Sequence, residues 1–271
     1  MSKKLSSVLL WIFAFIFMAT IAIYQRMTGP TYPVRAKVSI DNQLIKGKLL
    51  TSSDSEGDAS ISIAAVDTAI KGTYKYRRFK SNDEWTIAPL KREGGNLIAS
   101  LPHQPPAGKI MYSITLEKSG KTYELGKEPV VIRYKGKVPY YILIPHILFM
   151  FLAMVFSTRT GIEAIANRDN SFILSIWTTI FLTLGGLMLG PVVQYFAFGA
   201  FWTGWPWGHD LTDNKTAVAL LFWIIAIFRL RKDPKNRTWV IVASIMLLAV
   251  YLIPHSVLGS EIDYTKAAAV K

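Results

Sequence analysis

The chain has 271 residues, a net charge of +13, 51% hydrophobic residues and no cysteine. The lack of cysteine excludes disulfides, thiolate metal sites and cysteine nucleophiles. The charge does not indicate nucleic-acid binding, because the basic residues lie along alternating patterns or in short loops beside apolar segments and form no basic patch. The many aromatic residues fit a membrane protein that carries a polar domain.

The first apolar segment is Val8–Tyr24, which is uncharged and follows Lys3 and Lys4. Its length is near the minimum for a membrane-spanning helix. A signal peptide also has an apolar core, but a shorter one that is followed by a cleavage site with small residues. We therefore expect residues 1–30 to form an uncleaved anchor with its N-terminus in the cytoplasm.

Residues 31–136 consist of short alternating segments separated by turn signals such as Asp41-Asn42, Gly94-Gly95 and Ser119-Gly120. Such spacing is typical of an antiparallel β-sandwich, here expected outside the cytoplasm. The expected strands are Val34–Ile40, Ile45–Leu50, Ala59–Ala65, Gly72–Phe79, Trp85–Leu90, Asn96–Leu101, Lys109–Glu117, Thr122–Leu125 and Val130–Tyr134.

The stretch Leu101–Ile114 has a Pro/Gly-rich turn that leads into a strand with Tyr112. In this it resembles fibronectin type III and other immunoglobulin-like modules, in which such a strand carries a corner tyrosine. The resemblance covers about a third of the chain. It implies a domain that binds or spaces other proteins, and it implies no chemistry.

Four further apolar segments follow, at residues 138–157, 171–202, 216–230 and 239–258. The second of these is longer than a bilayer requires, and Gly185-Gly186 and Gly190-Pro191 are expected to bend or break it. Thr212 or Asp213 is expected to cap the next helix. The connecting loops Thr158–Asn170 and Arg229–Arg237 are basic, which predicts that they are cytoplasmic.

These observations predict an α-helical integral membrane protein with five transmembrane helices and an inserted extracytoplasmic all-β sandwich. The expected domains are the anchor 1–30, the sandwich 31–136, a four-helix membrane domain 137–260 with an outer loop 203–215, and an extracytoplasmic tail 261–271. The expected location is the cytoplasmic membrane of a bacterium, and the expected partners are membrane lipid and other membrane or extracytoplasmic proteins of a complex.

In this topology His146, His209 and His255 all lie on the outer side of the membrane. Ile-Pro-His occurs twice, ending at His146 and His255, and Asp210 follows His209. Imidazole is a common ligand of Zn, Cu and Fe, and two histidines from facing helices can hold haem b. The candidate ligands are therefore His146, His209, His255 and Asp210, and the candidate supporting residues are Asp213, Asn214 and Gln194.

Other interpretations remain open. The histidines can instead bond to carbonyls that Pro145 and Pro254 leave free. Residues 210–214 offer oxygen ligands for calcium but lack the EF-hand spacing. No Asp, Glu, Lys or Arg lies within 139–157, 171–208, 216–228 or 239–260, which counts against a transporter, and only the Gly/Pro-broken third segment favours one. The functional hypotheses are thus a redox or metal-handling protein and a non-catalytic envelope subunit whose β-sandwich binds a partner; no reaction is assigned.

Overall fold

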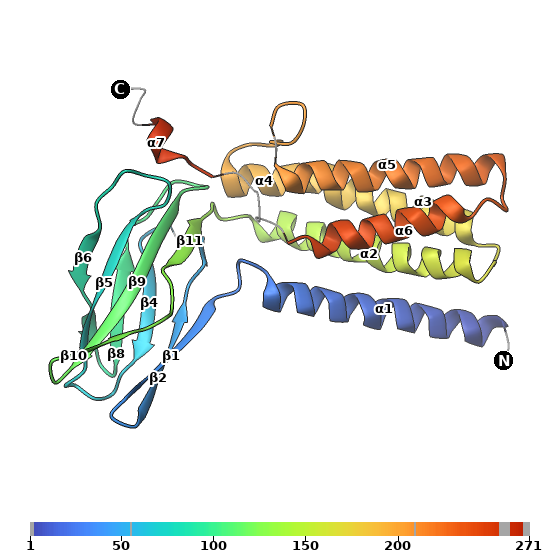
Figure 1. Ribbon diagram of the computed structural model, residues 1–271. Coiled ribbons are helices and arrows are strands. Elements are labelled where there is room, and N and C mark those ends of the chain that lie inside the picture. The colour runs from blue at the N-terminus through green and yellow to red at the C-terminus, as the bar shows by residue number, and fades with distance from the viewer. Residues whose placement is uncertain (1–2, 55, 209, 255–260, 268–271) are drawn as a thin grey trace. The chain divides into compact units, whose positions relative to one another are not determined.

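A computed structural model describes residues 3–54, 56–208, 210–254 and 261–267 (Figure 1). The chain divides into two compact units. One unit, here called the helical unit, comprises Met1–Gly29 and Val138–Gly259. The other, the β unit, comprises Pro30–Lys137 together with Ser260–Lys271.

The strands of the β unit lie close to the segments expected from alternation. They are β1 (Val34–Ile40), β2 (Gln43–Leu49), β3 (Ser52–Ser53), β4 (Ala59–Ala64), β5 (Lys71–Arg78), β6 (Thr86–Pro89), β7 (Lys91–Glu93), β8 (Asn96–Leu101), β9 (Lys109–Lys118), β10 (Lys121–Glu124) and β11 (Val130–Tyr134). The short helix α7 (Tyr264–Ala267) also belongs to this unit.

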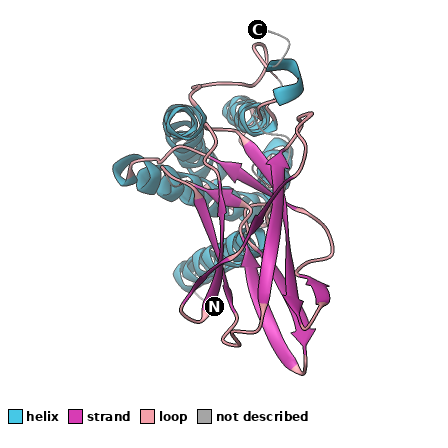
Figure 2. Cartoon of the chain, turned by 90° about the vertical axis from the view of Figure 1, so that its left-hand side faces the viewer, coloured by secondary structure: helices cyan, strands magenta, loops and turns pink. Residues whose placement is uncertain are grey.

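The strands form two sheets, which Figure 2 shows in magenta. The first has the order β1-β2-β4-β8-β7, and the second has the order β3-β11-β9-β5-β6 with β10 paired to β9. Pairing is antiparallel except between β3 and β11, which run parallel. The expectation of a wholly antiparallel sandwich is wrong at this point, because the chain crosses between the sheets after β2 and adds β3 as a short edge strand.

Two-residue turns close the hairpins where the sequence predicts them. Asp41 and Asn42 join β1 to β2 with φ of +45° and +62°, and Ser119 and Gly120 join β9 to β10 with φ of +52° and +73°. Two successive positive φ angles match the right-handed twist of a hairpin, and Asp, Asn and Gly tolerate them best. The turn predictions at these two places are confirmed.

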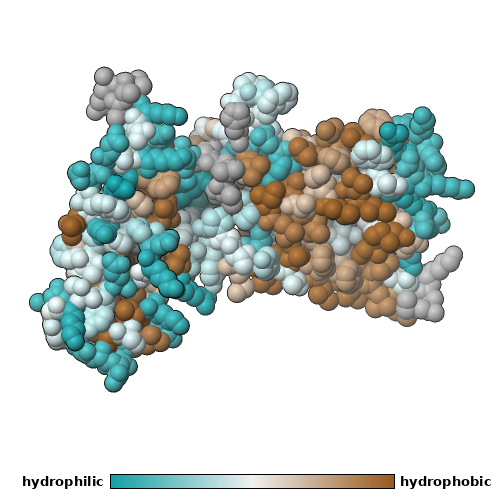
Figure 3. Space-filling view, viewed as in Figure 1, coloured by the Kyte–Doolittle hydropathy of each residue, from teal (hydrophilic) through white to brown (hydrophobic). Residues whose placement is uncertain are grey.

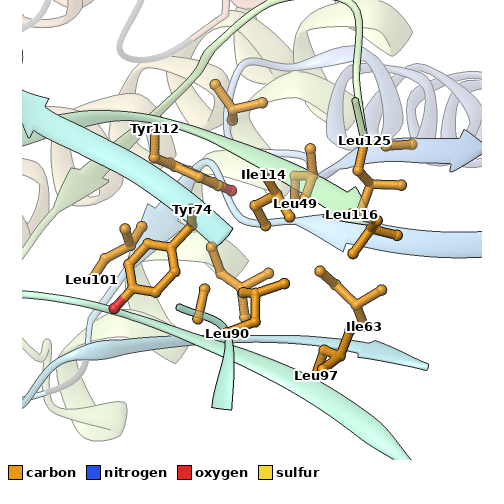
Figure 4. Packing of buried hydrophobic residues seen from close by; sticks show 14 of the residues in the cluster. Leu49, Ile63, Tyr74, Leu90, Leu97, Leu101, Tyr112, Ile114, Leu116 and Leu125 are labelled. Atoms are coloured by element: carbon orange, nitrogen blue, oxygen red, sulfur yellow. The ribbon is translucent and has the colours of Figure 1, made fainter. Parts of the chain in front are cut away.

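Alternate residues of both sheets point inward and share one hydrophobic core (Figure 4). Its members include Leu49, Ile63 and Leu97 from the first sheet and Tyr74, Ile114 and Leu116 from the second. Burial of each such side chain contributes roughly 1.5–3 kcal/mol. The β unit thus has a core of its own.

Tyr112 is fully buried in this core, and its hydroxyl donates a hydrogen bond to the carbonyl of Leu50 (2.9 Å). In a tyrosine corner the hydroxyl bonds to backbone only a few residues upstream. Here the partner is 62 residues away. The bond joins strand β9 to the chain that follows β2, which differs from the corner that the immunoglobulin-like resemblance implies.

The helical unit contains long apolar helices. They are α1 (Lys3–Thr28), α2 (Tyr140–Ile165), α3 (Ser171–Leu182), the π-helix η1 (Thr183–Leu189), α4 (Gly190–Phe198), α5 (Leu211–Lys232) and α6 (Thr238–Leu252). Among the described residues, four helical segments are long and apolar enough to cross a membrane, with α3, η1 and α4 forming one of them. Figure 3 shows apolar side chains gathered over these helices. These features are those of a membrane protein with a β domain.

The expected break in the third apolar segment is instead a π-helical stretch. The chain stays helical through Gly185 and Gly190, and the Gly190 amide bonds to the Gly185 carbonyl five residues earlier. A Cβ at Gly185 would lie 2.9 Å from the Met150 amide nitrogen, so glycine allows α2 to pack closely here. A wider helical turn accommodates the glycines without ending the helix.

Two expected boundaries are wrong. Most of the expected cytoplasmic loop 158–170 is helical, because α2 continues to Ile165. The expected fifth span is a helix only over Thr238–Leu252 in the described part of the chain, about 22 Å long at 1.5 Å per residue. This is shorter than the ~30 Å hydrocarbon core of a bilayer.

Candidate functional site

The loop between α4 and α5 is held to the start of α5 by the Asp213 carboxylate. Its Oδ2 accepts hydrogen bonds from the amides of Thr203 (2.7 Å) and Gly204 (3.0 Å) and from Gln194 Nε2 (3.2 Å). Asp213 is only 6% exposed. A Cβ on Gly204 would lie 2.7 Å from the Asp213 Cβ, so only glycine allows this approach. The carboxylate therefore serves as the fixed point on which the loop folds.

The neighbouring residues complete the same network. Asn214 Oδ1 accepts a hydrogen bond from the Trp205 amide (2.7 Å), and Trp202 Nε1 donates to the Trp205 carbonyl (3.2 Å). Gln194 Nε2 also donates to Thr203 Oγ1 (2.7 Å). The structure thus brings Gln194, Asp213 and Asn214 to one loop. Asp213 and Asn214 accept from loop amides, and Gln194 donates to Thr203 and Asp213, so all three have a structural role.

The N-cap of α5 is Asp210, whose Oδ1 accepts a hydrogen bond from the Thr212 amide (2.8 Å). The expectation that Thr212 or Asp213 caps this helix is wrong, because the helix begins at Leu211. An aspartate at this position satisfies a free amide of the first turn. Asp210 therefore already has one carboxylate oxygen engaged with the backbone.

Lys215 is likewise part of the helix and not of an exposed loop. Its side chain is buried, and its Nζ donates to the carbonyl of Ile253 (2.6 Å), which follows the end of α6. A lysine that ends on a backbone carbonyl joins the first turn of α5 to the last turn of α6. The basic residue expected in the outer loop thus helps to hold the helices together.

His146 lies in α2 beside the π-helix. Its Nδ1 is 2.9 Å from the carbonyl oxygen of Gly185. A carbonyl only accepts, so Nδ1 carries the proton and Nε2 has a free lone pair. A histidine that binds a metal through one ring nitrogen usually donates the N–H of the other to a carbonyl or carboxylate, and His146 has this second contact.

Of the other predicted ligands, Asp210 is the N-cap of α5. His209 and His255 lie outside the described residues. Among the residues that the structure does describe, no group of three or more His, Cys, Asp or Glu side chains could hold a metal ion. The proposed ligand set of His146, His209, His255 and Asp210 stays a prediction.

The sequence analysis missed a buried ion pair at the end of α2. Arg159 Nη1 donates to Glu163 Oε2 (2.5 Å), and the two side chains are 2% and 1% exposed. The other carboxylate oxygen, Oε1, accepts from the side-chain amide (3.1 Å) and backbone amide (3.3 Å) of Asn170. The guanidinium carbon of Arg159 is 5.6 Å from the ring centre of Trp11 in α1. The pair therefore connects α2 to the turn before α3 and to α1.

The spacing of Arg159 and Glu163 could have revealed this pair. Opposite charges four residues apart face each other on a helix. We expected a loop because charges after an apolar segment are usually exposed and cytoplasmic. Because Arg159 is buried, its charge does not indicate which side of the membrane the end of α2 faces.

Hydroxyl groups join α2 to its neighbours near this pair. Ser157 Oγ lies 3.2 Å from Ser244 Oγ in α6, and Thr160 Oγ1 lies 3.4 Å from Thr178 Oγ1 in α3. Thr160 and Thr178 also donate to carbonyls four residues earlier in their own helices. Small polar side chains of this kind let apolar helices approach closely. The hydroxyls act as packing contacts.

Comparison with known proteins adds little. No family model matches the chain, and no curated protein matches it. Among solved structures, the Br derivative of BhCBM56 is similar to part of the chain, with 13% sequence identity and a TM-score of 0.27. The match covers 36% of this chain and 98% of the BhCBM56 chain. A likeness this low carries no argument about fold or function.

Proposed function

We propose that the protein is a non-catalytic interaction subunit of a bacterial cytoplasmic membrane. The helices anchor it, and the β unit lies outside the cytoplasm and binds a partner protein. The basic residues Arg229, Arg231 and Lys232 in the last turn of α5 support a cytoplasmic end for that helix. Asp213, Lys215 and Glu163 have partners within the helical unit, so these polar groups serve the fold.

The observation that carries this proposal is an exposed patch on the second sheet, here called the β5–β6 patch. The ring of Trp85 lies beneath two cations, with Lys75 Nζ at 5.3 Å and the Arg77 guanidinium carbon at 4.7 Å from its centre. Ile87 pairs with Lys75 across the strands and is 68% exposed. Tryptophan and arginine dominate the binding energy of protein interfaces, and an exposed isoleucine beside them adds apolar area.

Cross-linking in cells tests the proposal. A photo-reactive amino acid placed at Lys75 or Ile87 should give a discrete adduct with another protein. The matched control is Ser100, which is exposed on the other sheet and should give no such adduct. If both patch positions give no adduct in cells that express the folded protein, the proposal is wrong.

A second candidate function is a metal or haem site in electron transfer or metal handling. The specific observation in its favour is the His146 imidazole, whose Nδ1 bonds to a carbonyl of a π-helix, a structure frequent at functional sites. His209, His255 and Asp210 would complete the site, for Cu, Fe, Zn or haem b. Metal analysis and a visible spectrum of the purified protein test it, and His146→Ala should lower the metal or haem content.

A further inference from the structure

The outer face of the β1–β2 hairpin carries a cluster of four positive charges, here called the cation ladder. The register pairs Arg35 with Lys48 and Lys37 with Lys46. All four residues are exposed, while the alternate residues of both strands point into the core. Directly opposite side chains on one face start about 5 Å apart, and the next pair lies about 7 Å further along the strands. Four cations thus occupy a small flat area.

On the turn side and on the β4 side of the cation ladder, the neighbouring positions are uncharged. The next pair on this face is Ser39 with Leu44. On the neighbouring strand β4, the register of Gly47 with Ile63 places Ser62 and Ala64 beside Lys48 and Lys46. Among the described residues, the ion pairs of the β unit leave out all four ladder cations.

Acidic residues approach the ladder on one side, at the open edge of β1. Arg35 donates to the hydroxyl of Tyr32 (2.6 Å), which leaves its charge in place. Glu124 and Glu128 line a groove together with Arg35 and Lys37, at the open edge of β1. On the other side, the residues of β4 that lie beside Lys46 and Lys48 are Ala64 and Ser62, which carry no charge.

Protection of an edge strand does not explain the arrangement. Exposed lysines on edge strands discourage unwanted pairing with other chains, which can account for the cations of β1. However, β2 lies between β1 and β4, so Lys46 and Lys48 protect no edge. Like charges directly opposite each other destabilise a sheet. An anionic surface laid across the hairpin would remove this repulsion.

We propose that the cation ladder binds the phosphate headgroups of anionic phospholipids. The inference rests on the proposed function in one respect, namely that the helices anchor the chain in a membrane. Only five residues, 29–33, connect the end of α1 to the start of β1, and they can span at most about 21 Å. Basic residues this close in sequence to a membrane span attract anionic lipid. A flat array of cations also suits a flat array of phosphates.

The full-length protein in lipid nanodiscs provides the test. The chain has no cysteine, so Ser39→Cys, next to the ladder on the same exposed face, gives a single site for an environment-sensitive fluorophore. We expect the fluorophore to be protected from an aqueous quencher in discs of phosphatidylglycerol and phosphatidylcholine, but not in discs of phosphatidylcholine alone. High salt should remove the protection, because it screens exposed charges.

Charge variants identify the residues responsible. Lys37→Gln or Lys46→Gln should each lower the ratio of lipid-bound to free β unit roughly fivefold. The matched control is Lys91→Gln, which removes the same charge from β7 at the far edge of the same sheet, where Lys91 pairs with Glu93. Unchanged thermal unfolding would show that each variant is folded.

Three results would overturn the proposal. The first is equal quenching in neutral and anionic discs. The second is protection that Lys46→Gln leaves intact. The third is protection that soluble polyglutamate abolishes, since the ladder would then prefer an acidic protein to lipid. The discs contain no cellular partner of the β unit, so failure here leaves the cross-linking result for the β5–β6 patch untouched.

Discussion

Replacing Asp213 by alanine tests whether its carboxylate is structural. The change removes the acceptor of the Thr203 amide and of the buried Gly204 amide, and Gln194 keeps only its bond to Thr203 Oγ1. An unpaired buried donor costs ~1–3 kcal/mol, and the lower value applies where water can enter. Trp205 beside it is 75% exposed, so water can reach the loop. We therefore expect a loss of about 3 kcal/mol in the free energy of unfolding.

Thermal unfolding in detergent, followed by tryptophan fluorescence, measures this loss. At ~2–4 °C per kcal/mol for a unit of this size, the midpoint should fall by about 6–12 °C. Asp213→Asn keeps one carbonyl oxygen and should lose only ~1 kcal/mol. The control is Asp169→Ala, since the Asp169 side chain is fully exposed and its ion pair with Arg237 is long at 3.5 Å. An unchanged midpoint for Asp213→Ala, together with lost metal, would refute the reasoning and identify Asp213 as a ligand.

Three further predictions concern buried pairs and pH. Glu163→Ala should cost about 3–5 kcal/mol in thermal unfolding because it leaves the Arg159 charge buried alone, whereas replacing both residues by leucine should restore most of the loss; no recovery would contradict this. Tyr112→Phe should cost about 1 kcal/mol by losing its bond to the Leu50 carbonyl, and an unchanged midpoint would count against that bond. Burial alone would raise the pKa of Glu261, but hydrogen bonds from Lys109 and Lys80 lower it below the usual 4.5. The pairing of Glu261 with these lysines therefore stabilises the fold above that pH, and the stabilisation is lost as the pH falls through the pKa of Glu261 in the folded protein. The protection factors of residues 261–267 in hydrogen exchange, which correct for the slower intrinsic exchange in acid, should therefore fall as the pH drops, and no fall would contradict the pairing.

The sequence predicted the strands of the β unit well because alternation and turn residues are local signals. It missed β3 and β7, which have two and three residues and so carry no visible alternation. It also missed the helical end of α2, since Arg159 and Glu163 look like exposed charges until the partner is known. The spacing of Arg159 and Glu163 allows the pair, but local patterns do not show that both side chains are buried or that Asn170 donates to the carboxylate.

The candidate site was predicted only in part, for a different reason. The residues of the outer loop were identified by type, and Gln194 and Asp213 do meet. The other partners of Asp213 include the backbone amides of Thr203 and Gly204, which every residue has, so no residue pattern indicates them. The loop geometry that aims Thr203 and Gly204 at one oxygen arises from the fold and not from the spacing of side chains.

The π-helix between α3 and α4 makes this region unusually tolerant of a shorter chain. A π turn holds about one residue more than an α turn but makes the same full rotation. Deleting a single residue within Thr183–Leu189 would leave a regular α turn and keep Gln194 on the side that faces Asp213. In a regular helix such as α3 a deletion would rotate everything that follows by about 100°, so a one-codon deletion should be less harmful in the π-helical segment than in its neighbours.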